Sequence, residues 1–280
     1  MRKITFKIFV LVNGLLLSVI IPVYSQLQPD TTSADTTMSL STPDSTMSDS
    51  SVTTFRTVPN NAWDVGEKLS FIVRYGPLVA GDATMEVADT VRHQDRLCYK
   101  IRTTANSNKF ISKFYKVRDK AESTMDAQGL FSWKFEKNLR EGKYKLDKLT
   151  EFDQTKHVAT SGRKTIDVPP NVQDVLSALY FMRTQNYAVG SVISLQNVAN
   201  MKLYDLKIKI HRKDRVRVRA GTFDCVVVEP FLIEGGGIFK HEGKILIWVT
   251  DDERHMPVQM KSKVFIGAVT AELVKIEGVD

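Results

Sequence analysis

The segment from Lys68 to Pro77, KLSFIVRYGP, gives the clearest indication of the fold. Large apolar side chains occupy every second position in it, namely Leu69, Phe71, Val73 and Tyr75. A period of two is typical of a β-strand that buries one face, and the Gly-Pro pair at its end marks a turn. The segment therefore predicts a strand that is followed directly by a change of direction.

The same alternation recurs along the rest of the chain and predicts further strands. Apolar residues take alternate positions in the stretches 83–87, 97–101, 131–135, 245–249 and 258–266. In 245–249 the second face is apolar as well, because it carries Leu246 and Trp248, so this strand is expected near the centre of a sheet. Short breaks that contain glycine separate the stretches, which is the pattern of an antiparallel sheet.

One segment has a helical period instead. Its apolar residues are Val172, Val175, Leu176, Leu179 and Met182. This spacing predicts an amphipathic helix over 172–183, with Asn171 as its N-cap and Asp174 in its first turn. The helix is expected to be either a fixed cover over the core or a movable gate over a ligand cavity. We therefore expect a mainly β fold, a curved antiparallel sheet or partly closed β-barrel with one amphipathic helix packed on it.

The chain begins like an exported protein. Basic residues at Arg2, Lys3 and Lys7 precede an uncharged apolar run over 8–23, and the small residue Ser25 follows. This order predicts a signal peptide over 1–25 that is cleaved near Ser25. No cysteine lies there to carry a lipid anchor, so we expect a soluble periplasmic protein. That location makes ATP, NAD and nucleic acid improbable ligands, and no cofactor is expected.

Residues 26–54 have the composition of a disordered linker. They contain no aromatic residue and consist mainly of Ser, Thr, Asp and Pro, so they cannot bury enough surface to fold. The triplets at 30–32, 35–37 and 44–46 are similar to the Asp-Ser/Thr-X acceptor for O-glycosylation in exported Bacteroidetes proteins. A glycosylated linker and a plain one both fit. The remaining residues, 55–280, are predicted to form a single β-rich domain.

Charge favours an anionic partner for this predicted domain. The chain has a formal net charge of +7, with three basic residues and no acid in 1–25. The stretch 26–54 has four acids and no base, which leaves about +8 for 55–280. A basic surface outside the cytoplasm suits phospholipid or lipopolysaccharide head groups, or acidic glycans.

The basic residues alternate most regularly in one candidate ribbon. Its members are Lys207, Lys209, His211, Arg215, Arg217 and Arg219. A turn at 212–214 would fold the ribbon into a hairpin that sets like charges opposite each other, which is destabilising. Either nearby acids or an anionic ligand must offset that repulsion. The ribbon is thus a solvated face, or it binds an anionic membrane surface or another envelope protein.

Residues that could carry chemistry are sparse. The five histidines show no metal-ligand spacing, and neither a nucleophile elbow nor a phosphate loop occurs, so we predict no catalytic residues and no metal site. A glycan hydrolase stays open, because it needs only two carboxylates brought together by the fold. Cys98 and Cys225 either form a disulfide or are two separate buried thiols.

Ordered blocks across the chain resemble a family of exported bacterial proteins known as domain of unknown function 3108. The blocks are Val65–Leu69, Val73–Gly76, Ala80–Ala83, Tyr115–Asp119, Gln173–Tyr180, Arg219–Cys225, Trp248–Asp252, Pro257–Val258 and Ile266–Gly267. The resemblance implies no reaction and no catalytic residues. The late blocks are more loosely similar to periplasmic lipoprotein carriers of the Lol type, which implies an unclosed barrel whose helices cover an apolar groove.

These observations lead to one expected function and two alternatives. We expect a non-catalytic envelope protein that binds a hydrophobic or lipidated ligand, such as a lipid or a lipoprotein, in a groove of the sheet. Candidate groove residues are Phe131, Trp133, Phe135, Leu179 and Trp248. The first alternative is an assembly or structural factor that binds other envelope proteins through the basic ribbon, and the second is a glycan hydrolase.

Overall fold

The structure is a computed structural model that describes residues 55–234, 237–238, 245–263 and 267–279. The predicted signal peptide and the predicted linker lie outside these residues. So does the end of the stretch predicted as a strand over 258–266. Those parts of the sequence analysis stay predictions.

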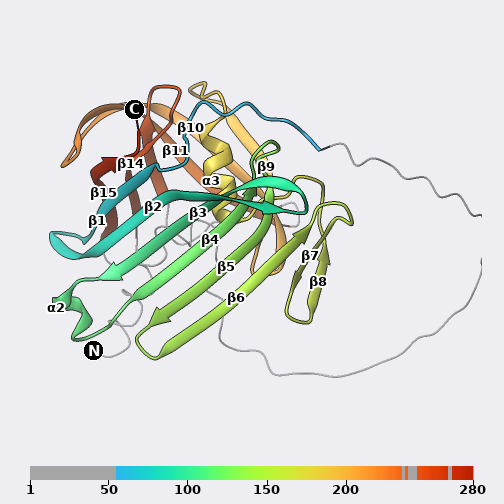
Figure 1. The fold of residues 1–280 in the computed structure, drawn as a ribbon. Helices are drawn as coiled ribbons and strands as arrows, with labels where there is room; N and C mark the ends of the chain where they lie inside the picture. Colours follow the sequence, from blue (N-terminus) through green and yellow to red (C-terminus); the bar gives the residue numbers. More distant parts are fainter. Residues whose placement is uncertain (1–54, 235–236, 239–244, 264–266, 280) are drawn as a thin grey trace, which may run out of the picture.

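The strands of the described residues join in one antiparallel sheet (Figure 1). Its first strands are β1 (Lys68–Tyr75), β2 (Leu78–His93), β3 (Arg96–Ser107), β4 (Arg118–Asp126), β5 (Ser132–Glu141), β6 (Tyr144–Asp153), β7 (Val158–Ser161) and β8 (Lys164–Asp167). The others are β9 (Val192–Ala199), β10 (Lys202–Val218), β11 (Gly221–Glu234), β12 (Gly237–Ile238), β13 (Ile245–Thr250), β14 (Pro257–Lys263) and β15 (Ala268–Glu277). Two helices are described with them, α2 (Lys109–Ser112) and α3 (Val175–Arg183).

The sheet is curved but not closed. Its order is β8-β7-β6-β5-β4-β3-β2-β1-β15-β14-β13-β11-β10-β9, with β12 beside β11, so β8 and β9 are edges. Irregular register in six strand pairs, including β4–β5 and β10–β11, lets the long strands bend. Figure 1 shows the sheet curving around α3. The predicted curved antiparallel sheet with a helix packed on it is confirmed.

The first strand behaves as its sequence predicts. Leu69, Phe71 and Val73 are buried in the main core, and β1 lies between β2 and β15. The predicted central position of β13 also holds, because this strand lies between β11 and β14 and is buried on both faces. Period-two patterning was therefore sufficient to place these two strands.

The helix begins later than the sequence suggested. Asp174 is the N-cap of α3, so the prediction of Asn171 as N-cap and of a helix from 172 was wrong. Asn171 has a positive φ of 59°, which a helix-capping residue in extended backbone does not have. Asp174 and Ser177 form a capping box, in which the side-chain oxygen of each residue accepts a hydrogen bond from the backbone N–H of the other.

Asp174 also fastens the start of α3 to the sheet. Its carboxylate accepts hydrogen bonds from the hydroxyls of Ser123 on β4, at 2.6 Å, and Ser132 on β5, at 2.5 Å. Burial raises the pKa of this carboxyl, while its hydrogen bonds act in the opposite direction. Because α3 contacts β3, β4 and β9, it bridges two regions of the sheet that are far apart in the strand order.

Candidate functional site

A pocket opens on the concave side of the sheet, at the start of α3. Its lining comes from β5, β6, α3, the end of β9 and the turn after it, and is mostly apolar. The lining residues are Phe135, Lys137, Lys148, Thr150, Phe152, Val175, Val198, Ala199 and Asn200. The cavity volume is about 20 Å³, little more than the space for one water molecule, and the pocket opens to solvent. The pocket is therefore shallow, with room for a small head group rather than for a long chain.

The register of β5 and β6 places two lysines inside this pocket. Phe135 pairs with Thr150, and two residues further along Lys137 pairs with Lys148, so all four side chains share the concave face. Lys137 is only 6% exposed, and its Nζ lies 3.4 Å from Oδ1 of Asn200. The pocket thus combines an apolar floor with two directly opposed cations.

The two lysines have no negative partner within the described part of the chain. Burial lowers the pKa of Lys137 to about 8, and the positive charge of Lys148 adds to this. The pKa of Lys148 is lowered as well, by burial and by Lys164 on β8. A buried ammonium is costly without a counter-charge, so this pocket favours an anion from outside the chain.

The lysine pair is not among the site residues predicted from the sequence. Lys137 occupies an inward position of β5, as Phe135 and Leu139 do. A lysine at a position where alternation predicts an apolar residue is the one sign in the sequence that this residue is unusual. Recognising Lys148 as its neighbour requires the β5–β6 register, and Asn200 reaches the pocket from a distant turn. Of the five candidate groove residues, only Phe135 lines the pocket.

The other candidate groove residues lie in separate places. Leu179 packs against the main core, whereas Phe131 and Trp133 belong to a second cluster with Cys98. Trp248 belongs to a third cluster, and its Nε1 donates to Asp214 at 3.0 Å. The five residues do not line one groove.

A bulge explains why the aromatic stretch 131–135 is split. Thr124 on β4 pairs with Lys134, but its neighbour Met125 pairs with Ser132, so Trp133 has no partner in the register. The extra residue interrupts the alternation between the two faces. Phe135 therefore joins the main core while Trp133 joins the other cluster, although the sequence spacing predicted one shared face.

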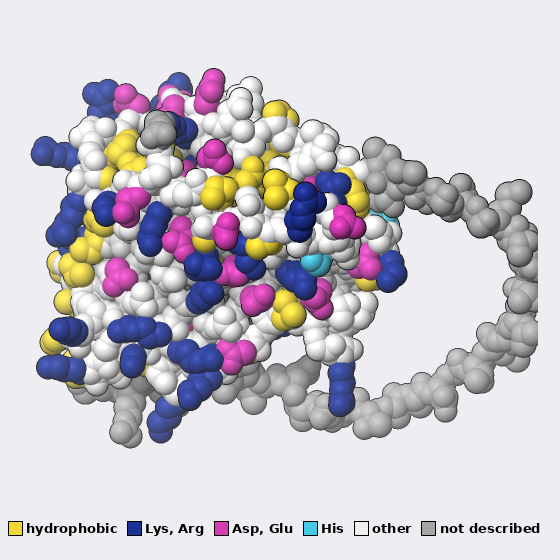
Figure 2. Space-filling model, viewed as in Figure 1, with side chains coloured by type: hydrophobic (Ala, Val, Ile, Leu, Met, Phe, Trp, Pro, Cys, Tyr) yellow, Lys and Arg dark blue, Asp and Glu magenta, His cyan; other side chains and the backbone are white. Residues whose placement is uncertain are grey.

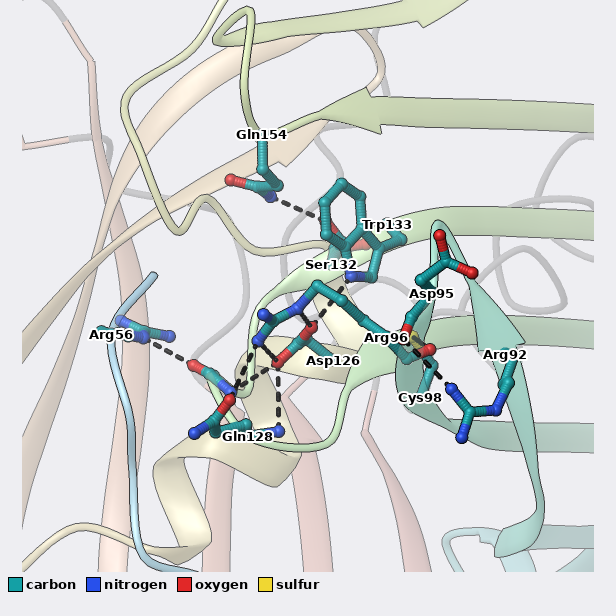
Figure 3. Close-up of polar contacts among 11 residues, drawn as sticks. Arg56, Arg92, Asp95, Arg96, Cys98, Asp126, Gln128, Ser132, Trp133 and Gln154 are labelled. Carbon is teal, nitrogen blue, oxygen red and sulfur yellow. Dashed lines mark hydrogen bonds and ion pairs between the residues drawn. The ribbon is translucent and has the colours of Figure 1, made fainter. Parts of the chain in front are cut away.

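The cluster around Trp133 is organised by a buried carboxylate (Figure 3). Asp126 accepts from Nη2 of Arg96 at 2.9 Å, from the backbone N–H of Gly129 at 2.6 Å and from Nε1 of Trp133 at 3.2 Å. Burial alone would raise the pKa of Asp126, but these donors lower it overall. Arg96 also lies over the ring of Phe55, 4.6 Å from its centroid. Trp133 is thus held within a structural network.

The predicted hairpin of the basic ribbon is wrong. The ribbon residues up to Arg217 belong to one continuous strand, β10, which pairs with β11 and β9 and has a bulge between Ile210 and Arg212 instead of a turn. The predicted repulsion between Lys209 and Arg217, and between Lys207 and Arg219, therefore does not arise. The extra residue of the bulge is His211, whereas residues 212–214 pair regularly with β11.

Acids on neighbouring elements neutralise part of the basic ribbon. His211 lies 2.6 Å from Glu229, and Arg215 binds Asp224 at 2.7 Å. Lys207 donates to the hydroxyl of Ser194 at 2.6 Å. The remaining ribbon residues Lys209, Arg217 and Arg219 are exposed.

The two cysteines are free and buried, so the possible disulfide is absent from the structure. Cys98 packs with Phe131 and Trp133, and Cys225 packs in the separate cluster of Trp248. Burial raises the pKa of each thiol to about 12. Both are therefore protonated thiols at neutral pH. Of the two alternatives that the sequence left open, the structure has two separate buried thiols.

The described residues offer no metal site, and no carboxyl group lines the pocket. No group of three histidine, cysteine or acidic side chains is placed to hold a metal ion there. Burial raises the pKa of Asp119 to about 6, but this carboxyl accepts from the backbone N–H of Arg140 at 2.6 Å and does not line the pocket. None of the described helices is long and apolar enough to cross a membrane.

Comparison with solved structures places the fold. A β-barrel-like protein of the DUF1849 domain from Brucella abortus has a TM-score of 0.53 and 9% identity, covering 77% of this chain and 98% of its own. An inferred exported protein with a YmcC-like fold from Bacteroides fragilis has a TM-score of 0.35 and 11% identity, covering 80% and 99%. An inferred lipoprotein from Parabacteroides distasonis has a TM-score of 0.35 and 8% identity, covering 79% and 97%.

The first of these likenesses supports the unclosed, barrel-like sheet and, at such low identity, shows the fold alone. No curated protein matches the chain. The resemblance drawn from the sequence blocks is confirmed by a family model that matches residues 70–274, more than half of the chain. The chain therefore belongs to the family described as protein of unknown function (DUF3108).

Proposed function

We propose that this protein is an exported envelope protein that binds a small amphiphile with an anionic head and a short apolar body. The binding site is the pocket at the start of α3. One observation carries the proposal: Lys137 is buried in a mostly apolar lining, faces Lys148, and has no carboxylate partner among the described residues. Export rests on the predicted signal peptide over 1–25.

The two parts of the ligand follow from the two parts of the lining. An anionic head would sit between Lys137 and Lys148, where it offsets their mutual repulsion and makes charge-assisted hydrogen bonds. The side-chain amide of Asn200 lies beside Lys137. The apolar body would pack on Phe135, Phe152 and neighbouring aliphatic side chains of the lining. The lining therefore favours, among hydrophobic or lipidated ligands, one that carries a negatively charged group at the end of a short apolar chain.

Isothermal titration calorimetry with octanoate and octanol tests the proposal. Octanoate is expected to bind the wild-type protein, and octanol is expected to bind at least tenfold more weakly because it lacks the charge. The variant Lys137→Met is expected to lose at least tenfold in octanoate affinity while keeping octanol affinity. Methionine matches the lysine side chain as far as Cε and lacks only the ammonium group beyond it, so the comparison tests the charge.

The matched control is Lys209→Met, which removes an exposed lysine from β10. Its octanoate affinity is expected to equal that of the wild type. Equal binding of octanoate and octanol to the wild type, or an unchanged affinity in Lys137→Met, contradicts the proposed site.

A further inference from the structure

An exposed aromatic and basic tip lies at one end of the sheet, away from the pocket lysines. It is formed by α2 with the residues that follow it, and by the turn between β5 and β6. We refer to it as the α2 tip, and its members are Lys109, Phe110, Lys113, Phe114, Lys116, Lys143, Tyr144 and Lys145. The two segments meet where the backbone N–H of Gly142 donates to the carbonyl of Lys116 at 2.8 Å.

The aromatic side chains of the α2 tip face solvent. Phe110 is 56% exposed, Phe114 is 73% exposed and Tyr144 is 50% exposed. The two phenylalanine rings lie edge to face, with centroids 5.6 Å apart. Exposed aromatic side chains grouped in this way mark an interaction surface more often than single exposed residues do.

The backbone holds these rings outward. Asn108 caps α2 by accepting from the N–H of Ile111 at 2.9 Å, and its amide donates to the carbonyl of Val79 at 2.7 Å. Ile111 is the inward anchor and packs in a small cluster with Ala80 and Val117. With the helix fixed by Ile111, the rings on either side of it remain in solvent.

The charge around the rings has one sign. Residues 109–118 contain three lysines and one arginine but no acid, and residues 142–145 contain two lysines and no acid. The acids that flank these segments, Asp119 and Glu141, are buried. Figure 2 shows Lys and Arg side chains gathered in the lower left of the view, where Figure 1 has α2 and the β5–β6 turn.

We propose that the α2 tip docks on an anionic phospholipid bilayer. Lysines attract the negative surface, and aromatic rings are favoured at the level of the head groups, so the two features suit the same partner. The basic ribbon on β10, which the sequence offered for the same role, has no aromatic side chains between its charges and is partly neutralised by acids. The proposal is independent of the pocket and its ligand.

Sedimentation with phosphatidylcholine vesicles, with and without phosphatidylglycerol, tests this proposal on the full protein. The wild type is expected to bind only vesicles that contain phosphatidylglycerol, and to bind less at higher salt. The double variant Lys113→Glu with Lys116→Glu, and the double variant Phe110→Ser with Phe114→Ser, are each expected to weaken binding at least tenfold. All four side chains are exposed, so the variants should keep the wild-type unfolding temperature.

Two controls match these variants. Leu97→Ser removes an apolar side chain, 51% exposed, from the start of β3. Arg217→Glu with Arg219→Glu reverses two exposed charges of the basic ribbon. Both controls are expected to bind like the wild type. The proposal is overturned if the ribbon variant loses binding while the α2 variants keep it. It is also overturned if the wild type does not bind the vesicles, a result that would favour a protein partner for the α2 tip.

Discussion

Replacing Arg183 by alanine is expected to lower the free energy of unfolding by about 3–5 kcal/mol, because it leaves a buried carboxylate without its partner. Arg183, at the end of α3, is fully buried and binds both oxygens of Glu67, at 2.6 and 2.7 Å. Its guanidinium also donates to the carbonyls of Ala62 and Arg254. One side chain therefore joins the helix to the segment before β1 and to the β13–β14 turn. Urea denaturation at pH 7 measures the effect.

Arg215→Ala is the matched control for this prediction. Arg215 pairs with Asp224 in the same bidentate manner, but both side chains are exposed, so we expect a loss of less than about 1 kcal/mol. A similar loss in the two variants would contradict the role given to the buried pair. Glu67→Gln should also destabilise the protein, since it leaves the Arg183 charge unpaired.

Lys137→Met is expected to stabilise the protein at pH 7, by up to about 3 kcal/mol. The folded pKa of Lys137 is about 8 and its ordinary value is 10.5, so the charged form is disfavoured in the folded state. The wild type should therefore gain stability as the pH rises from about 8 towards 10.5. The advantage of the variant is largest below pH 8 and shrinks above it. Urea denaturation at pH 7 and at a pH near 10 measures the difference.

Lys209→Met again provides the control, because this lysine is exposed and its removal should change stability by less than about 0.5 kcal/mol. A loss of stability in Lys137→Met at pH 7 would contradict the account. A residue that is kept for binding is expected to lower the stability of the protein when its site is empty.

The sequence predicts the sheet well where its alternation is undisturbed. In β1 and β13, spacing alone identified the buried faces, because every second side chain of a regular strand points the same way. It failed at Trp133, since a bulge depends on the partner strand β4 and leaves no mark in the spacing of β5. The same limit explains the wrong hairpin at 212–214, because the polar residues there resemble a turn but pair regularly with β11.

For the helix as well, the sequence predicts its existence but not the residue at which it begins. The apolar stripe predicted α3, but its start was set by Asp174, whose carboxylate also accepts from hydroxyls on β4 and β5. The candidate site is harder to predict from the sequence, because Lys137, Lys148 and Asn200 come from two strands and a distant turn. The β5–β6 register pairs the two lysines, and the curvature of the sheet brings Asn200 from the far edge to them.

The ionisation of Lys137 shows whether the pocket at the start of α3 binds an anion. It can be followed by NMR of the lysine side chains in isotope-labelled protein, with Lys137→Met to assign the signal and octanoate as the probe ligand. We predict a titration midpoint near pH 8 without octanoate, and a higher midpoint with it, because a bound carboxylate favours the charged ammonium. A midpoint near the ordinary value of 10.5 that octanoate does not move would contradict the account.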